Sequence, residues 1–420
     1  MKLTRLGALV AGAVLVFGAC SSTSSPAASS GAGGGTIAIK VGIELPMTGG
    51  EAPNGVPTAN GVALALSQIT VPGFTITINQ QDDAVNGKHN ANQGATNMGL
   101  LANDAQVLFV VGPYNSSVAQ AEIPVTNAAG LIQCSPANTA VSLTKGDSAV
   151  ALRKTNPSKI AYVRVATTDD NQGAGGADIV YNTIGAKSAY VLDDTQTYGK
   201  GLAQGFADAY TKLGGTILKT DSPPDTTTDF TSYVTAIKGV NPPAVFYGGV
   251  TTSGIGLFRK QMAQQGLTNI PLAGGDGISD GSAATASSFL NIAGDGSANT
   301  YSTVAAIHDI PNPDKFAADY KTKFNTDPGA YSAPGYACTQ IFLQALKAVS
   351  SGVTDLAKLR EAVRAYVADP SHSFDTVLGK VGFDANGDTT QHSISYYKYD
   401  ATAKDWVFFK QRDFIADPIK

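Results

Sequence analysis

The sequence predicts a mixed α/β protein made of two doubly wound lobes, each a parallel sheet covered by helices on both faces. From Ile37 onward, short β-branched runs alternate with helix-like segments, which is the pattern of such sheets. The alternation forms two successive series, and the second begins after Ile160. The 385 residues after Gly35 also exceed what one compact core usually holds. Two lobes are therefore expected.

The first series supplies the elements of one lobe. Its expected strands are 37–45, 74–79, 107–111 and 131–134, and its expected helices are 59–69, 90–102 and 116–129. The run Val107–Val111 is entirely apolar and ends at Gly112, which predicts a strand buried on both faces of the sheet.

The second series supplies the other lobe. Its expected strands are 162–166, 188–192, 216–219, 244–247 and 270–273, and its expected helices are 172–184, 199–213, 230–237 and 254–265. After Asn299 the pattern changes to a crossing strand at 301–306, helices at 314–325, 331–350 and 355–366, and strands at 377–383, 393–399 and 406–410.

This order predicts that the chain re-enters the first lobe and then returns to the second. The expected first lobe comprises residues 37–162 and 304–382, and the expected second lobe comprises 163–303 and 383–420. The segments that cross between the lobes are expected to be hinges.

The leader indicates where the chain is sent. Lys2 and Arg5 precede the 14-residue apolar stretch Leu6–Ala19, which is short for a membrane span and typical of an export signal. Cys20 follows, and then a stretch of small residues to Gly35. The combination resembles a bacterial lipoprotein signal. It implies a signal peptide at 1–19, a lipid-anchored linker at 20–36 and attachment to the extracytoplasmic face of the cell membrane.

One position departs from that pattern. Phe17 stands where lipoprotein signals usually carry Leu, so ordinary secretion is the alternative. The formal net charge of −4 becomes −6 without Lys2 and Arg5, which argues against a nucleic-acid partner. No second apolar run approaches the length of a membrane-spanning helix.

Apart from Cys20, the chain has two cysteines, Cys134 and Cys338. An even pair in an oxidising compartment predicts a disulfide, and two buried thiols are the alternative. The sequence separation does not decide between them, because the bond depends on the distance between the two Cα atoms.

Four loops at the expected carboxyl ends of strands carry polar groups, at the edge where open parallel sheets bind ligands. They are 112–117, 135–139, 194–199 and 274–277. Ser116 is a candidate helix N-cap beside free N–H groups that bind anions, or only a capping serine. The second loop offers a carbonyl and the Thr139 hydroxyl to a cation, or is only a turn. The last two loops place Tyr198 and Asp276 in the second lobe.

Motifs across the chain add a family resemblance. They are Val41–Gly49, Asp82-Asp83, 112–117, 135–139, 194–202, 247–249 and 382–388. In this order and spacing, over some 360 residues from Ile39 to about Asp400, the chain resembles the periplasmic branched-chain amino-acid binding proteins, the leucine/isoleucine/valine receptors of ABC importers. The resemblance implies a type I periplasmic binding protein fold, with two lobes joined by three hinge crossings.

The resemblance also implies roles for residues. In this family a loop serine and backbone N–H groups hold the ligand carboxylate, which points to Ser116, Ala137 and Thr139. A main-chain carbonyl, a threonine hydroxyl and an acid from the other lobe hold the ammonium, which points to Ala137, Thr139 and Asp276. The second-lobe tyrosine corresponds to Tyr198.

Departures from the family fall on the side-chain pocket. Asn54 and Val250 stand where the family often has aromatic residues, and Asp276 stands where it usually has Glu. Val85 and Asn115 replace a family cysteine pair. An amino-acid ligand is therefore better supported than a branched-chain one.

Enzyme and metal signals are weak. Ser142 to Lys145 matches S-x-x-K without its companion motifs. The four histidines lack metal-ligand spacing, and the Asp384–Asp388 segment fails as a calcium loop at Thr389 and Ser395. No catalytic residue, metal or cofactor is expected.

The sequence thus predicts a monomeric, lipid-tethered receptor that captures an amino acid and presents it to an ABC permease. The alternatives are a sensing receptor of the same fold for an amide, urea or an aromatic acid, and a secreted hydrolase.

Overall fold

The computed structural model describes residues 36–419. The predicted signal peptide, Cys20 and nearly all of the predicted linker lie outside this range. Among the described residues, no helix combines the length and the apolar character that crossing a membrane requires.

The first sheet contains five parallel strands in the order β2-β1-β5-β6-β7. They are β1 (Ile37–Leu45), β2 (Phe74–Asp82), β5 (Val107–Val111), β6 (Ile132–Ser135) and β7 (Tyr162–Arg164). All five residues of β5 have no exposed surface, so the strand predicted to be buried on both faces is confirmed.

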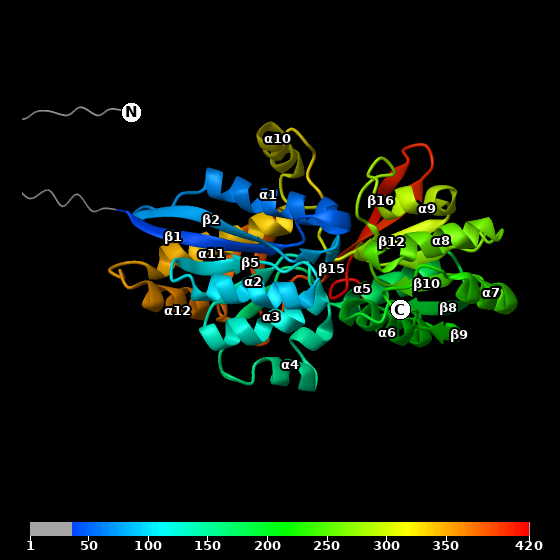
Figure 1. Ribbon diagram of the computed structural model, residues 1–420, viewed down its shortest axis with the longest axis horizontal. Helices are drawn as coiled ribbons and strands as arrows, with labels where there is room; N and C mark the ends of the chain where they lie inside the picture. The colour runs from blue at the N-terminus through cyan, green and yellow to red at the C-terminus, as the bar shows by residue number, and fades with distance from the viewer. Residues whose placement is uncertain (1–35, 420) are drawn as a thin grey trace, which may run out of the picture. The chain divides into compact units, whose positions relative to one another are not determined.

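Helices cover both faces of this sheet. Those in the first part of the chain are α1 (Ala52–Gln68), α2 (Ala91–Asn103), α3 (Ser116–Ala129) and α4 (Gly146–Leu152). Helix α1 packs on α11 (Ser332–Val349), and α2 packs on α3. Figure 1 shows α1 and α3 on opposite sides of the sheet. A short hairpin, β3 (Ala84–Val85) and β4 (Lys88–His89), follows β2.

The second sheet contains seven strands in the order β16-β15-β12-β11-β10-β8-β9. They are β8 (Ser188–Asp193), β9 (Thr216–Asp221), β10 (Val245–Gly248), β11 (Leu272–Gly274), β12 (Thr300–Val304), β15 (Ser393–Asp400) and β16 (Asp405–Asp413). The first five of these in chain order are parallel, whereas β15 and β16 run antiparallel to their neighbours. A short turn joins β15 to β16, and short turns join only antiparallel neighbours.

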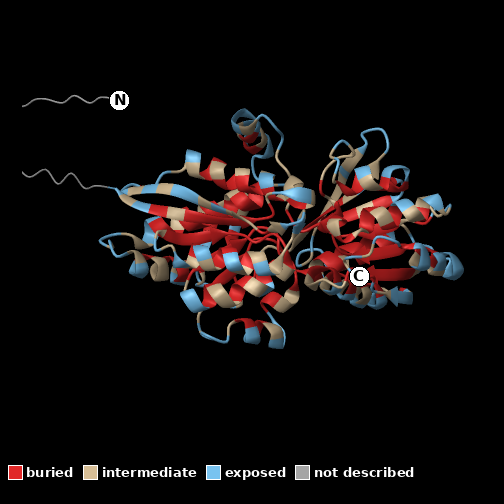
Figure 2. Cartoon of the chain, in the orientation of Figure 1, coloured by how far each residue is buried: buried red, intermediate tan, exposed pale blue. Residues whose placement is uncertain are grey.

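Both faces of the second sheet are buried. Its helices are α5 (Asp169–Asp178), α6 (Thr197–Lys212), α7 (Thr231–Val240), α8 (Ile255–Gln264) and α9 (Phe289–Ala293). Along β10, Val245 and Tyr247 join one apolar cluster and Phe246 joins another. Since successive strand residues face opposite sides, the sheet separates two cores. Figure 2 shows the buried strands beneath more exposed helices.

The chain passes between the two sheets three times, after β7, after β12 and before β15. The segment between β12 and β15 holds α10 (Pro313–Phe324), α11, α12 (Leu356–Val367) and the hairpin β13 (Ser373–Thr376) and β14 (Gly379–Gly382). Helices α11 and α12 pack on the strands of the first sheet. The predicted return to the first lobe is therefore confirmed, whereas the residue-level lobe boundaries stay predictions.

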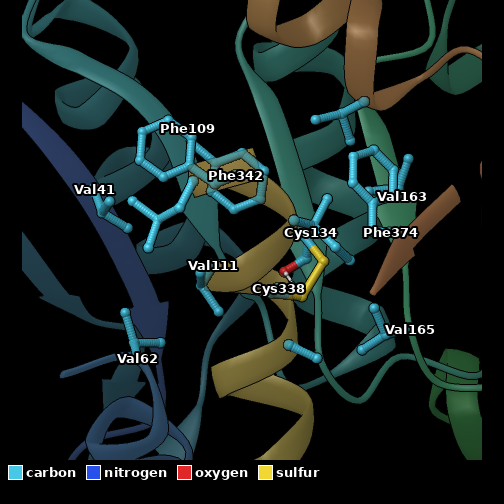
Figure 3. Close-up of a cluster of buried hydrophobic side chains, with 14 of the residues drawn as sticks. Val41, Val62, Phe109, Val111, Cys134, Val163, Val165, Cys338, Phe342 and Phe374 are labelled. Atoms are coloured by element: carbon cyan, nitrogen blue, oxygen red, sulfur yellow. Dashed lines mark hydrogen bonds between the residues drawn. A yellow bond between two sulfur atoms is a disulfide. The ribbon is translucent and has the colours of Figure 1, made fainter. Parts of the chain in front are cut away.

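A disulfide crosses the first core. Cys134 of β6 and Cys338 of α11 are bonded with a Cα–Cα distance of 5.8 Å, and both are fully buried. Figure 3 shows the bond beside the stacked rings of Phe109 and Phe342, whose centroids are 5.1 Å apart. The bond ties the strand that leads into the loop at 135–139 to the helix that follows Tyr331.

The strand expected at 162–166 in the second lobe is β7, which pairs with β6 in the first sheet, so its assignment to the second lobe is wrong. Two other elements also differ from the sequence prediction in detail. Helix α1 starts at Ala52 rather than residue 59. Pro53 lies in its first turn, where backbone N–H groups make no hydrogen bond within the helix, so a proline is tolerated there. The strand predicted at 377–383 is present as β14, but its hairpin partner β13 was not predicted. Gly379, at φ +85°, forms the turn between β13 and β14, a backbone conformation that favours glycine.

Candidate functional site

A cavity lies between the two lobes, at the carboxyl ends of the parallel strands. Its lining residues are Tyr114, Asn115, Ser116, Ala137, Thr139, Tyr198, Val250, Asp276 and Gly277, and its empty volume is about 280 Å³. Six of the seven ligand-binding residues predicted from the sequence line it. The seventh, Asn54, does not.

The first-lobe side of the cavity is built from a helix start and a tight loop. Ser116 is the first residue of α3, and Asn115 precedes it with extended backbone, so the prediction that Ser116 is the N-cap is wrong by one position. The first N–H groups of a helix have no partner within it, and the helix dipole favours negative charge there. Ser116 adds a hydroxyl, which accepts a hydrogen bond of 3.4 Å from the Ala140 N–H. This side of the cavity therefore suits an anion.

The loop at 135–139 is held by Ser135. Its hydroxyl accepts from the N–H groups of Ala137 at 3.2 Å and Asn138 at 2.9 Å, and donates to the Pro113 carbonyl at 2.8 Å. The Ala137 N–H expected to hold a ligand carboxylate is thus already engaged by Ser135. Thr139, which is 1% exposed, also lines the cavity.

The second-lobe side of the cavity carries one buried acid. Asp276 accepts from the Tyr198 hydroxyl at 2.5 Å, and its other carboxylate oxygen accepts from the Tyr331 hydroxyl. Burial raises the pKa of Asp276, while the hydrogen bonds from Tyr198, Tyr331 and Gln172 oppose this rise. Because Tyr331 precedes α11 in the first lobe, both lobes hold the carboxylate in place.

Glycines beside Asp276 allow this close packing. A Cβ atom at Gly275 would lie 2.2 Å from the Tyr198 hydroxyl oxygen, and one at Gly277 would lie 2.3 Å from the Gly249 carbonyl oxygen. Side chains at these positions would displace the tyrosine or the neighbouring loop.

Asn54 lies in a different place from the one predicted. It lines a larger space, of about 1230 Å³ empty volume, together with Asp280, Tyr397 and Trp406 near the segments that cross between the lobes. Since α1 begins at Ala52, Asn54 is held in its first turn, where the Asn54 carbonyl accepts from the Thr58 hydroxyl at 2.7 Å.

Tyr331 and Tyr114 are site residues that sequence reasoning missed. The sequence predicts Tyr331 only as the first residue of a long helix. No local pattern indicates its hydrogen bond with Asp276, which is 55 positions away in the chain. Tyr114 belongs to the loop at 112–117, where a polar aromatic residue at the end of a buried strand was an available signal. The two rings meet edge to face, with centroids 5.3 Å apart.

A polar contact also joins the two lobes, through Glu51. Glu51 of the first lobe accepts from the Thr252 hydroxyl of the second lobe at 2.6 Å and pairs with His89 at 2.7 Å. Burial alone would raise the pKa of Glu51, but the charge of His89 and hydrogen bonds from His89, Thr252 and Asn115 lower it to about 2. Burial likewise opposes protonation of His89, yet Glu51 raises the pKa of His89 above its ordinary value.

The site offers no metal centre. Within residues 36–419, no group of three or more His, Cys, Asp or Glu side chains is arranged to hold a metal ion. The residues that line the cavity instead offer backbone N–H groups, hydroxyls and one carboxylate, which can bind charged and polar groups.

Known proteins share this architecture. A model of the periplasmic binding protein family matches residues 38–404. The Leu/Ile/Val-binding protein BraC3 of Rhizobium johnstonii is 29% identical over 370 residues, which are 86% of this chain and 92% of that protein.

Solved structures of binding proteins have the same fold. A leucine-binding protein from Thermotoga maritima has a TM-score of 0.74 at 25% identity, covering 89% of this chain and 99% of its own. A solute-binding protein of an ABC transporter from R. palustris, solved with benzoate, has a TM-score of 0.70 at 20% identity, covering 89% of this chain and 96% of its own, and this likeness concerns the fold alone. The chain therefore belongs to the periplasmic binding protein family, and its predicted resemblance to the leucine/isoleucine/valine receptors is confirmed.

Proposed function

We propose that this protein captures an amino acid between its two lobes and delivers it to the permease of an ABC importer. The observation that carries this is the pairing of unlike walls across one cavity. The start of α3 and the Ser116 hydroxyl face the buried carboxylate of Asp276. A zwitterion needs an anion site and a cation site close together and shielded from water.

The charge of Asp276 favours an amino acid over a simple carboxylic acid. An aromatic acid such as benzoate, which the R. palustris neighbour was solved with, would bring no cation to this buried carboxylate. An ammonium group would pair with it. The names of relatives such as BraC3 point in the same direction.

Closure supplies the transport signal. Ligand first meets the wall of Ser116, Ala137 and Thr139, and the second lobe then rotates about the three crossings to bring Tyr198, Val250 and Asp276 against it. Only the closed form docks productively on the permease in this proposal. The protein acts as a binding protein that releases its ligand unchanged, with no reaction catalysed.

A thermal-shift screen of the purified protein against amino acids, amides, urea and aromatic acids tests the ligand class. A ligand at 100 times its dissociation constant adds about 2.7 kcal/mol of stability. Stabilisation by amino acids is expected, whereas stabilisation by aromatic acids alone would favour the sensing or aromatic-acid alternative.

Calorimetry of Asp276→Ala tests the site. Binding of every amino acid found in the screen should be lost with the fold intact. Asp280→Asn is the matched control, because Asp280 is equally buried in the same loop but accepts from the Phe289 N–H at 2.9 Å and does not line the cavity. Unchanged affinity in Asp276→Ala would show that the site lies elsewhere.

The proposal includes a lipid anchor at Cys20, after a signal peptide at residues 1–19. The support is the leader sequence and the stretch of small residues that follows it. Cells expressing the wild-type chain should incorporate labelled fatty acid into it and retain it in the membrane fraction. Cys20→Ala should abolish both, and membrane retention of unlabelled wild-type protein would exclude lipidation.

A further inference from the structure

We infer that the ligand is a small amino acid whose side chain carries a hydroxyl or a carboxamide, and that Tyr114 and Asn115 recognise that group. This inference rests on the proposed function and deepens it. It differs from what the names of most relatives indicate, which is an aliphatic side chain, although one relative from Pseudomonas aeruginosa is named for threonine as well as for leucine, isoleucine, valine and alanine.

Two polar atoms of the cavity wall carry the argument. Tyr114 is 8% exposed and Asn115 is 6% exposed, and both line the cavity. Among residues 36–419, neither the Tyr114 hydroxyl nor the Asn115 Oδ1 atom has a hydrogen-bond partner. Buried polar groups nearly always have partners, so an unpaired hydroxyl and an unpaired amide oxygen in a ligand cavity call for polar groups on the ligand.

The backbone of the loop that carries these residues and the Tyr114 ring are held by several contacts. The Tyr114 carbonyl accepts from the Asn138 side chain at 2.7 Å, and the Tyr114 ring packs against Tyr331. At Gly112, a Cβ atom would lie 2.0 Å from the Glu44 carbonyl oxygen, which shows how tightly the loop lies on β1. The unpaired atoms are thus held at the cavity wall.

Their chemistry defines the complementary group. A tyrosine hydroxyl both donates and accepts, whereas the Asn115 Oδ1 atom only accepts. A hydroxyl or carboxamide on the ligand can donate to Asn115 and accept from Tyr114. An aliphatic side chain has no group that could form a hydrogen bond with either atom. Sites built to bond a hydroxyl discriminate strongly against the analogue that lacks it.

Size and charge narrow the choice further. The empty space of the cavity, about 280 Å³ with the part open to solvent included, favours a compact side chain. Burial raises the pKa of the Tyr114 hydroxyl, and the charges of the Asp276, Glu51 and Asp280 carboxylates raise it further, so an acidic ligand side chain beside this hydroxyl would be repelled. Serine, threonine and asparagine satisfy all these conditions.

L-threonine and L-valine form the matched pair for the test, since they share one shape and differ by a hydroxyl and a methyl group. Calorimetry of the purified full chain should give at least tenfold tighter binding for threonine. Equal or tighter binding of valine would overturn the inference and leave the proposed function standing. If no amino acid binds, the proposed function itself fails, and the inference fails with it.

Tyr114→Phe assigns the preference to its residue. The threonine-to-valine affinity ratio should fall at least fivefold, because only the hydroxyl is removed. Tyr247→Phe is the control, since the Tyr247 hydroxyl is also buried and unpaired among the described residues but belongs to the core of the second lobe. An unchanged ratio in Tyr114→Phe, or an equal fall in Tyr247→Phe, would overturn the assignment.

Discussion

The two walls of the interlobe cavity present different chemical groups. The first-lobe wall uses the backbone of α3 and the loop at 135–139, supplemented by small hydroxyls. The second-lobe wall depends on one carboxylate, Asp276, oriented by the hydroxyls of Tyr198 and Tyr331. Backbone groups remain in place when a single side chain is replaced, so the first-lobe wall should keep most of its affinity for a ligand. The second-lobe wall has one charged side chain, and replacing it removes the charge entirely. Two side chains that are similarly buried at the cavity can therefore differ greatly in how much their substitution changes ligand affinity.

The largest effect is expected for Asp276→Asn. The amide preserves the shape of the carboxylate but removes its charge, and losing one member of a buried charge pair costs about 2–5 kcal/mol. The affinity for the best amino-acid ligand should fall about 100-fold in calorimetry. Binding of an uncharged amide ligand should not fall in parallel. A decrease below tenfold would contradict the idea that this wall rests on a single charge.

A smaller effect is expected for Ser116→Ala. The hydroxyl is lost but the N–H groups at the start of α3 remain, so about a tenfold loss of affinity is expected, equivalent to about 1.4 kcal/mol. Ser117→Ala is the control, because Ser117 is the next residue and does not line the cavity. If Ser116→Ala lost as much ligand affinity as Asp276→Asn, the proposed difference between the two walls would be wrong.

Tyr331→Phe should lower the affinity by a few-fold and change its pH dependence. Burial already raises the pKa of Asp276, and the variant removes one hydrogen bond that opposes the rise. Since binding an ammonium requires the ionised carboxylate, affinity should be lost at a higher pH than in the wild type as the pH falls. Tyr336→Phe, whose hydroxyl instead bonds to Gln68, should match the wild-type pH profile.

The smallest effect concerns the pair of Glu51 and His89 at the contact between the lobes. Because the pKa of Glu51 is lowered from 4.5 to about 2, its contribution to stability is present above pH 4.5 and is lost as the pH falls toward 2. Because the pKa of His89 is raised above 6.5, its contribution is present below pH 6.5 and is lost as the pH rises through the folded-state value.

The pair should therefore stabilise the fold most between about pH 4.5 and 6.5. His89→Gln should lower the melting temperature by about 1–4 °C in this window and less above it. His308→Gln provides the control, since His308 pairs with Asp309 at a far more exposed position. A uniform decrease at all pH values would indicate lost packing rather than lost charge.

Much of the site was predictable because it follows local rules. A strand that ends at a glycine-containing loop and leads into a helix places its loop at a ligand-binding edge, and this located Ser116, Thr139, Tyr198 and Asp276. Asn54 was expected at the cavity only because of its position in the family pattern, and it lies in the first turn of α1, away from the residues that line the cavity.

The α/β class, the two successive lobes and the loops that line the interlobe cavity could be predicted from the sequence alone. These follow from hydrophobic periodicity and turn chemistry, which act over a few residues. Only the tertiary structure decided that Tyr331 would bond to Asp276, that Cys134 would meet Cys338, and that Tyr114 and Asn115 would be left without partners at the cavity wall. Such contacts join residues far apart in the chain, and their existence depends on how the two lobes pack rather than on any local pattern.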